Sequence, residues 1–222
     1  MTINQLADSA VPATARAASA DRRHRLLTVP GAIGIGFTLS WVVGLAIPAP
    51  SPKFGASGAQ IVSAVAGHAP ALAAQYALTE GLPAAGIAVV AVALARVTGS
   101  RLALVAGVTA AVISVLQFCL GLWLSATSSP GTAHVLFQLV NRMDGGKMLV
   151  LAVLGAASAA SVMLPRWLRY AGAALAVAIA ASGVVYLLLV QSLWLLAGPA
   201  LLLLLVFITG AGIWLGGTAR GR

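Results

Sequence analysis

Six long runs of mostly apolar residues are the feature that most limits how this chain can fold. A helical run of about 20 apolar residues spans the hydrocarbon core of a bilayer, which is about 30 Å thick. Of the 222 residues, 60% are hydrophobic and 8% are charged, whereas a soluble domain has about 25% charged residues. The sequence therefore predicts an all-α integral membrane protein with six transmembrane helices, at residues 31–49, 69–95, 102–125, 144–164, 170–190 and 194–216.

The distribution of Lys and Arg predicts the orientation of these spans. Positive charge gathers in cytoplasmic segments, and Lys53, Arg142 and Lys147 are the basic residues that fall on the opposite side when both termini are cytoplasmic. We expect a basic cytoplasmic tail at 1–30, partly disordered, a membrane domain at 31–216 and a second basic tail at 217–222. The residues predicted to face the cytoplasm are Arg16, Arg22, Arg23, Arg25, Arg96, Arg101, Arg166, Arg169, Arg220 and Arg222.

The first apolar run has a second interpretation. A basic cluster precedes it, as in a signal peptide. A cut after Ala49 would leave Pro50 next to the cleavage site, which signal peptidases disfavour, so we expect the first span to be retained. The abundance of Arg over Lys, and of Ala, Gly and Val, is typical of a GC-rich bacterial genome. The predicted location is a bacterial plasma (inner) membrane.

Two segments outside the spans have helical patterns. In the loop 50–68, Ile61 and Val65 are four residues apart, which predicts a short amphipathic helix that lies on the outer surface after the first span. An ordered loop that caps the bundle is the alternative interpretation. The segment before the fourth span predicts a helical extension, either separate from that span or continuous with it. We expect Gly145 and Gly146 to break the register or let the backbone bend.

Glu80 is the main candidate for a functional residue because a carboxylate inside a membrane span is costly and usually serves a site. Its position in the second span predicts a depth near the membrane midplane. Tyr76 lies one helical turn before it, and Pro83 lies three residues after it, which predicts a kink beside the acid. A purely structural Glu that links two helices is the alternative interpretation.

A second polar group precedes and enters the fourth span. His134, Gln138, Asn141 and Arg142 share one helical face, and Asp144 and Lys147 are three residues apart. We place residues 141–147 at the outer rim of a cavity, with an interfacial cluster of snorkelling charges as the alternative. A contact of Glu80 with Arg142 or Lys147 would explain how the buried charges are tolerated. Gln117 and Ser114 in the third span are further candidates.

The predicted catalytic residues are Glu80 and Asp144. The predicted substrate-binding residues are Tyr76, Gln117, His134, Gln138, Asn141, Arg142 and Lys147.

Other classes of site are disfavoured by the sequence. It has one Cys and none of the common metal, nucleotide or hydrolase motifs, so we predict no metal and no cofactor. The basic residues follow the membrane topology and form no groove with interleaved aromatics, so we predict no nucleic-acid partner. The predicted partners are the lipid bilayer and a hydrophobic small molecule or lipid. Gly212 and Gly216 also allow a homodimer through the sixth span.

Three functions compete. The first is a protein that transports or binds a small hydrophobic or amphipathic molecule in a polar cavity that opens outward. The second is a metal-independent acid/base enzyme, of the isomerase or terpenoid-cyclase type, acting on a hydrophobic substrate in the membrane. The third is a non-catalytic accessory subunit in which the charges only hold the bundle together.

Overall fold

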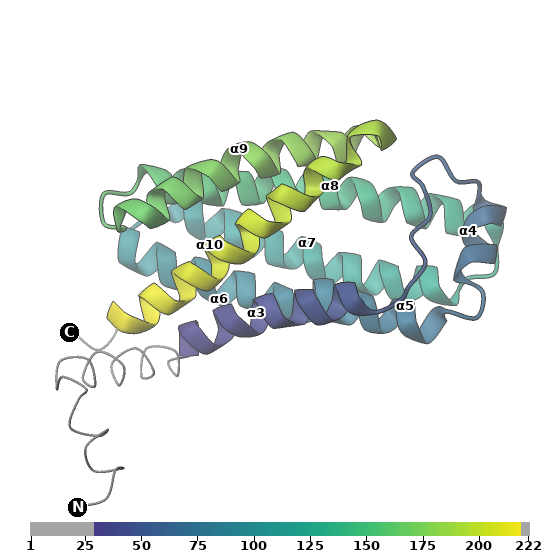
Figure 1. Ribbon diagram of the computed structural model, residues 1–222, viewed down its shortest axis with the longest axis horizontal. Helices are drawn as coiled ribbons and strands as arrows, with labels where there is room; N and C mark the ends of the chain where they lie inside the picture. The colour runs from purple at the N-terminus through teal and green to yellow at the C-terminus, as the bar shows by residue number, and fades with distance from the viewer. Residues whose placement is uncertain (1–28, 219–222) are drawn as a thin grey trace, which may run out of the picture.

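The computed structural model describes residues 29–218 as a bundle of helices (Figure 1). The predicted tail at 1–30 and the predicted tail at 217–222 lie almost wholly outside the described residues. Within the described part the structure contains no strand. Within residues 29–218, six helical stretches are long and apolar enough to cross a membrane, at Val29–Ala46, Ala69–Thr98, Arg101–Ala126, Pro130–Ala160, Arg166–Leu188 and Gln191–Gly217. The chain is thus an all-helical protein whose helices indicate a multi-pass membrane protein.

The elements follow one another without long gaps. Helix α3 is Val29–Ala46, and the short α4 is Gly58–Val65. The second long stretch consists of α5, Ala69–Tyr76, the π-helical turn η1, Ala77–Gly81, and α6, Leu82–Thr98. The remaining elements are α7, Arg101–Ala126, α8, Pro130–Ala160, α9, Arg166–Leu188, the 3₁₀ helix η2, Gln191–Leu196, and α10, Ala197–Thr218.

The helix ends carry the side chains that helix termini require. Ser57, Ser100 and Ser129 precede α4, α7 and α8, and each accepts a hydrogen bond from a backbone N–H in the first turn. Gly99 ends α6 with φ +69°, a conformation that glycine adopts without strain. Local sequence signals therefore account for these boundaries.

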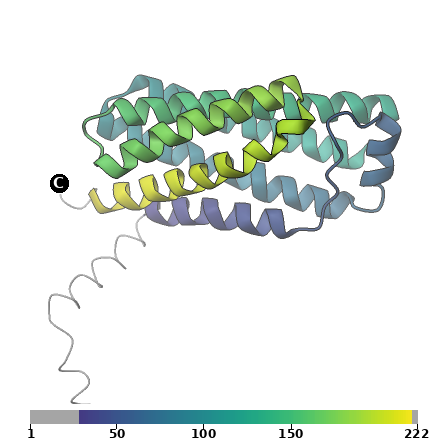
Figure 2. The ribbon, with the colours of Figure 1, turned by 45° about the horizontal axis from the view of Figure 1, so that its top comes forward.

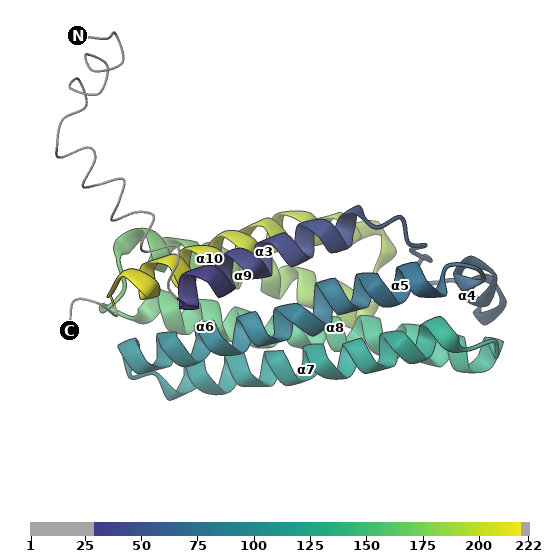
Figure 3. The same cartoon turned by 90° about the horizontal axis from the view of Figure 1, so that it is seen from below.

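The long helices run along a common axis, and α10 crosses the others at an angle (Figures 1 and 2). Helix α4 lies at one end of the bundle, and the described chain begins and ends at the other (Figure 3). We name these the α4 end and the terminal end. The loop between α3 and α4 passes over the bundle toward η2, where the Phe54 N–H donates to Gln191 Oε1 at 2.8 Å.

Helices α8 and α9 pack closely because glycine pairs meet at two points. A Cβ on Gly155 would lie 2.7 Å from the Gly172 carbonyl oxygen, and one on Gly145 would lie 2.6 Å from the Gly183 carbonyl oxygen. Helix α8 runs unbroken through Gly145 and Gly146, so the expected break there is wrong. Gly145 instead lets two backbones approach, in the manner of small residues in membrane helices.

Helix α4 caps the bundle. Its apolar residues Ile61 and Val65 are buried, in a cluster with Leu72 of α5, Leu124 of α7 and Phe137 of α8. The segment is a helix, as the first interpretation predicts. It caps the bundle, as the alternative predicts, because the apolar face of α4 turns toward protein. The extension before the fourth span is likewise continuous with that span, because α8 starts at Pro130.

Candidate functional site

Glu80, Lys147 and Asp144 form an ion triad near the middle of the bundle, between η1 and α8. Lys147 Nζ lies 2.8 and 2.7 Å from the two carboxylate oxygens of Glu80, and 2.7 Å from Asp144 Oδ1. The predicted pairing of Glu80 with Lys147 is confirmed. The side chains of Glu80 and Lys147 are 8% and 6% exposed, and that of Asp144 is 21% exposed. Asp144 is thus the member of the triad that remains accessible.

The backbone around Glu80 departs from an α-helix. Glu80 lies in η1, and the Leu82 N–H reaches back to the Ala77 carbonyl across five residues. Pro83, which follows in the first turn of α6, has no N–H to donate. The kink expected beside the acid is therefore a single π-helical turn, a feature that often marks functional sites. Thr79, also in this turn, donates its hydroxyl to the Gln75 carbonyl oxygen at 2.9 Å.

Helix α7 supplies the polar residues behind the triad. Gln117 Nε2 lies 3.2 Å from the Val140 carbonyl oxygen and 3.4 Å from Asp144 Oδ1, and Ser114 is buried beside Glu80. Helix α7 packs between α6 and α8, so these side chains tie the two helices that carry the charges. The sequence predicted both residues correctly as members of this polar group.

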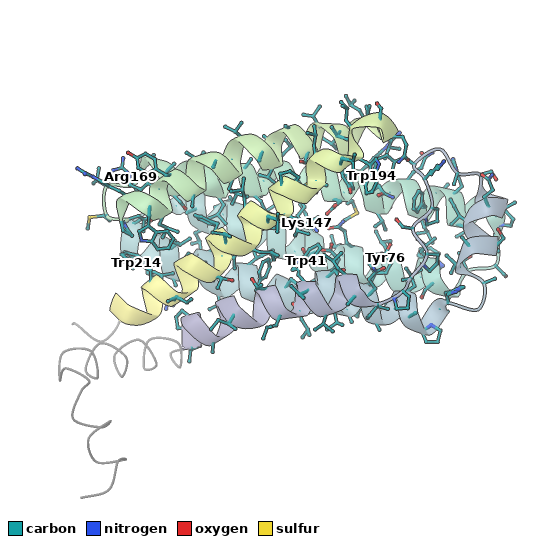
Figure 4. The ribbon with its side chains drawn as sticks, in the orientation of Figure 1. Trp41, Tyr76, Lys147, Arg169, Trp194 and Trp214 are labelled. Atoms are coloured by element: carbon teal, nitrogen blue, oxygen red, sulfur yellow. The ribbon has the colours of Figure 1, made fainter. Side chains whose placement is uncertain are left out.

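A cavity of about 300 Å³ adjoins the triad. Asp144 and Lys147 form its charged edge, and three aromatic residues, Trp41 of α3, Tyr186 of α9 and Trp194 of η2, form part of its wall. Figure 4 labels Trp41, Lys147 and Trp194 in the central part of the bundle. The remaining wall is aliphatic, from Leu45, Met148, Leu151, Ile179, Leu195, Ala197, Gly198, Ala200, Leu201 and Leu204. The predicted polar cavity is therefore apolar over most of its wall.

Further cavities continue from this one toward the α4 end. Tyr186 and Trp194 also line a cavity of about 390 Å³ with Lys53, Phe54 and Gln191. The Phe54 and Tyr186 rings meet edge to face with centroids 5.2 Å apart. The loop between α3 and α4 thus separates the cavity beside the triad from the end of the bundle.

The predicted site residues divide into those at the triad and those away from it. Tyr76 and Asn141 line a separate cavity of about 180 Å³ beneath α4. His134 Nδ1 lies 3.3 Å from the Ala56 carbonyl oxygen, and its Nε2 lies 2.9 Å from Gln138 Nε2, so these two residues join α8 to the loop before α4. None of these four residues contacts the ion triad through a hydrogen bond that the structure records.

The predicted placement of the charges around Asp144 needs correction. Arg142 is exposed and lies on the side of α8 opposite Asp144, so it does not pair with Glu80. Lys147 is buried in the bundle, so neither the outer-rim position nor the snorkelling alternative holds for it. The cause is that α8 extends far beyond the predicted span, which places Lys147 near the middle of the helix.

Sequence reasoning missed the aromatic wall. Trp41 packs against the main core and also lines the cavity. Tryptophan in membrane helices is enriched at the two membrane interfaces, and Trp41 lies away from both predicted ends of the first span. That position was the sequence signal that could have pointed to a place in the cavity wall. The face that carries Gly212 is occupied: a Cβ there would lie 2.5 Å from the Pro30 carbonyl oxygen of α3, which leaves no room for a second copy at that point.

Comparisons with known proteins give no assignment for this chain. It matches no protein-family model, no curated protein and no solved structure. The functional conclusion therefore comes from the geometry of the site.

Proposed function

We propose that this protein binds a small hydrophobic or amphipathic molecule in the cavity beside Asp144 and Lys147, for transport or for binding alone. The observation that carries the proposal is a charged triad at the edge of a cavity with apolar and aromatic walls. Ligand sites usually combine an apolar wall with a few polar groups that orient the ligand, in volumes of about 300–1,000 Å³. Intramembrane charges are conserved for function because they are costly to bury.

The ligand is expected to enter from the outer side of a bacterial plasma membrane. The α4 end carries Lys53, whereas Arg96, Arg101, Arg166 and Arg169 lie at the terminal end. By the positive-inside rule the terminal end faces the cytoplasm. The cavities that continue from Tyr186 and Trp194 toward Lys53 and Gln191 support an outward route.

The exposure of Asp144 favours one alternative, an acid/base enzyme acting on a hydrophobic substrate. The cavity is lined by Asp144, and Glu80 is not among its wall residues. In such an enzyme Asp144 would exchange the proton with the substrate and Glu80 would position Lys147. Chemical analysis of the bound molecule before and after incubation separates this activity from binding, since only an enzyme changes it.

The proposal is tested by filling the cavity. Gly198 lines it, and a Cβ there meets no atom within 4 Å, so Gly198→Trp adds an indole ring without an initial clash. We expect a panel of small hydrophobic and amphipathic molecules to raise the unfolding temperature of the purified wild type, and Gly198→Trp to lose that effect. Gly131→Trp is the matched control, because Gly131 also has open space around it but lies at the start of α8. Equal effects in both variants would refute the proposed site.

A further inference from the structure

The charges of the triad do not balance. Glu80 and Asp144 share one cation, Lys147, so the ionised triad carries a formal charge of −1. Among the described residues, no second Lys, Arg or His lines the cavity beside it. A net charge inside a low-dielectric region is costly unless an opposite charge compensates it. With both carboxylates ionised, the site therefore lacks one positive charge, which a proton or a bound cation would supply.

The hydrogen bonds show where that charge would be placed. Both oxygens of Glu80 face Lys147 Nζ, at 2.8 and 2.7 Å. Asp144 Oδ1 receives Lys147 and Gln117, at 2.7 and 3.4 Å, whereas Asp144 Oδ2 takes part in no hydrogen bond within the described residues. This second oxygen belongs to the one member of the triad that is both accessible and in contact with the cavity.

The wall of the cavity specifies the kind of cation. Metal ions such as Ca²⁺ require several oxygen ligands, and no described group of three or more His, Cys, Asp or Glu residues meets that requirement. The wall instead holds Trp41, Tyr186 and Trp194. Aromatic faces attract organic cations, most of all when the cation is desolvated. An aliphatic lining of Leu and Ile side chains suits an apolar substituent on the same molecule.

We propose that the ligand of this cavity is a lipophilic organic cation of charge +1, an amine or a quaternary ammonium, with Asp144 as its counter-ion and the three aromatic residues around its charged group. This inference rests on the proposed function, because it names the class of molecule that the cavity takes. It also explains why the triad has two carboxylates and one amine, since a bound cation brings the site to neutrality.

Three probes of similar shape and different charge test the inference on the purified protein in detergent. They are benzyltrimethylammonium, its neutral carbon isostere neopentylbenzene, and the anion phenylmethanesulfonate. Tryptophan fluorescence reports binding because Trp41 and Trp194 line the cavity. We expect the cation to bind wild type at least tenfold more tightly than the neutral isostere, and the anion to bind more weakly than either.

The variant Asp144→Asn removes the counter-ion and leaves Glu80 and Lys147 as a balanced pair. It should weaken binding of the cation at least tenfold and leave binding of the neutral isostere unchanged within about twofold. Arg142→Gln is the control, because it changes the charge of α8 on an exposed face. If Asp144→Asn does not fold, the order of the affinities of the three probes for the wild type still tests the inference.

The outcomes separate this inference from the proposed function. Equal binding of the cation and its neutral isostere, or tighter binding of the anion, would overturn the inference and leave a site for small hydrophobic molecules. If Gly198→Trp did not reduce binding of the cation, the cation would be binding to detergent or to the protein surface. That result would overturn both the inference and the proposed function. Failure of all three probes to bind, together with failure of the wider panel, would also overturn both.

Discussion

The two halves of the bundle differ in the side chains that they bury between their helices. Toward the terminal end, Leu94, Leu154 and Leu168 are fully buried in an apolar core, and the Gly155–Gly172 contact brings α8 and α9 together. Ser158, a buried polar side chain close by, donates to the Leu154 carbonyl of its own helix. The links between helices in this half include single hydrogen bonds, from Arg169 Nε to the Ala159 carbonyl of α8 and from the Thr209 hydroxyl to the Gly34 carbonyl of α3, and no buried ion pair is found there among the described residues.

From the middle of the bundle toward the α4 end, the same helices enclose two carboxylates, one ammonium group, a buried amide and several cavities. Helix packing does not require these buried charges, because replacing a buried ion group with apolar side chains of similar volume is often neutral or stabilising. We infer from this contrast that the terminal half supplies stability, whereas the α4 half keeps costly buried charges for the proposed function. The following predictions test that contrast.

The largest effect is expected for Lys147→Met. It leaves two buried carboxylates without their shared cation, and breaking a buried ion pair in this way costs about 3–5 kcal/mol. The measurement is the free energy of unfolding in mixed micelles. The triple variant Lys147→Met, Glu80→Gln, Asp144→Asn should recover most of the loss but not the binding.

The control for this change is Arg142→Met on the exposed face of the same helix, with an expected effect within about 0.5 kcal/mol. A loss below about 1 kcal/mol for Lys147→Met would mean that the triad is not held together in the folded protein. Full ligand binding in the triple variant would show that the three charges are not needed for binding.

Intermediate effects are expected at the two glycine contacts. A methyl group at Gly145 or Gly155 meets a backbone carbonyl oxygen at 2.6 or 2.7 Å, and overpacking of this kind costs about 1–3 kcal/mol. Both variants to Ala should lower stability. Only Gly145→Ala should also weaken ligand binding, since it moves α8 next to Asp144 and Lys147.

Gly146→Ala is the matched control for both, because a Cβ there meets nothing within 4 Å. It should raise stability by about 0.5–1 kcal/mol through helix propensity. If Gly155→Ala weakened binding as much as Gly145→Ala, the two halves would be mechanically coupled, and their proposed division of roles would be wrong.

The smallest effect on stability is expected for Phe54→Ala. The edge-to-face contact with Tyr186 contributes about 0.5–1.5 kcal/mol beyond the area that it buries. The substitution should speed association of benzyltrimethylammonium, measured by stopped-flow tryptophan fluorescence, because the loop then covers the cavity less. Tyr170→Ala, at an exposed aromatic of the terminal half, should leave the rate unchanged; an equal increase there would exclude an entry route beside Phe54.

Much of the architecture was predictable because it depends on local properties of the chain. Apolar runs of sufficient length mark the long helices, and serines such as Ser100 and Ser129 mark where two of them begin. The bounds of the fourth span were less predictable. The helix starts at Pro130 rather than 144, because polar residues that pack against protein interrupt the hydropathy signal without interrupting the helix. It ends at Ala160 rather than 164.

The sequence by itself determined that Glu80 needs a partner and that Lys147 was one of two candidates, because a lone charge in an apolar helix is too costly. Only the tertiary structure decided between Arg142 and Lys147, since the choice depends on the rotation of α8, which the Gly145–Gly183 contact helps to fix. The aromatic cavity also lay beyond sequence reasoning. Trp41, Tyr186 and Trp194 come from three elements, and no local pattern records that they meet.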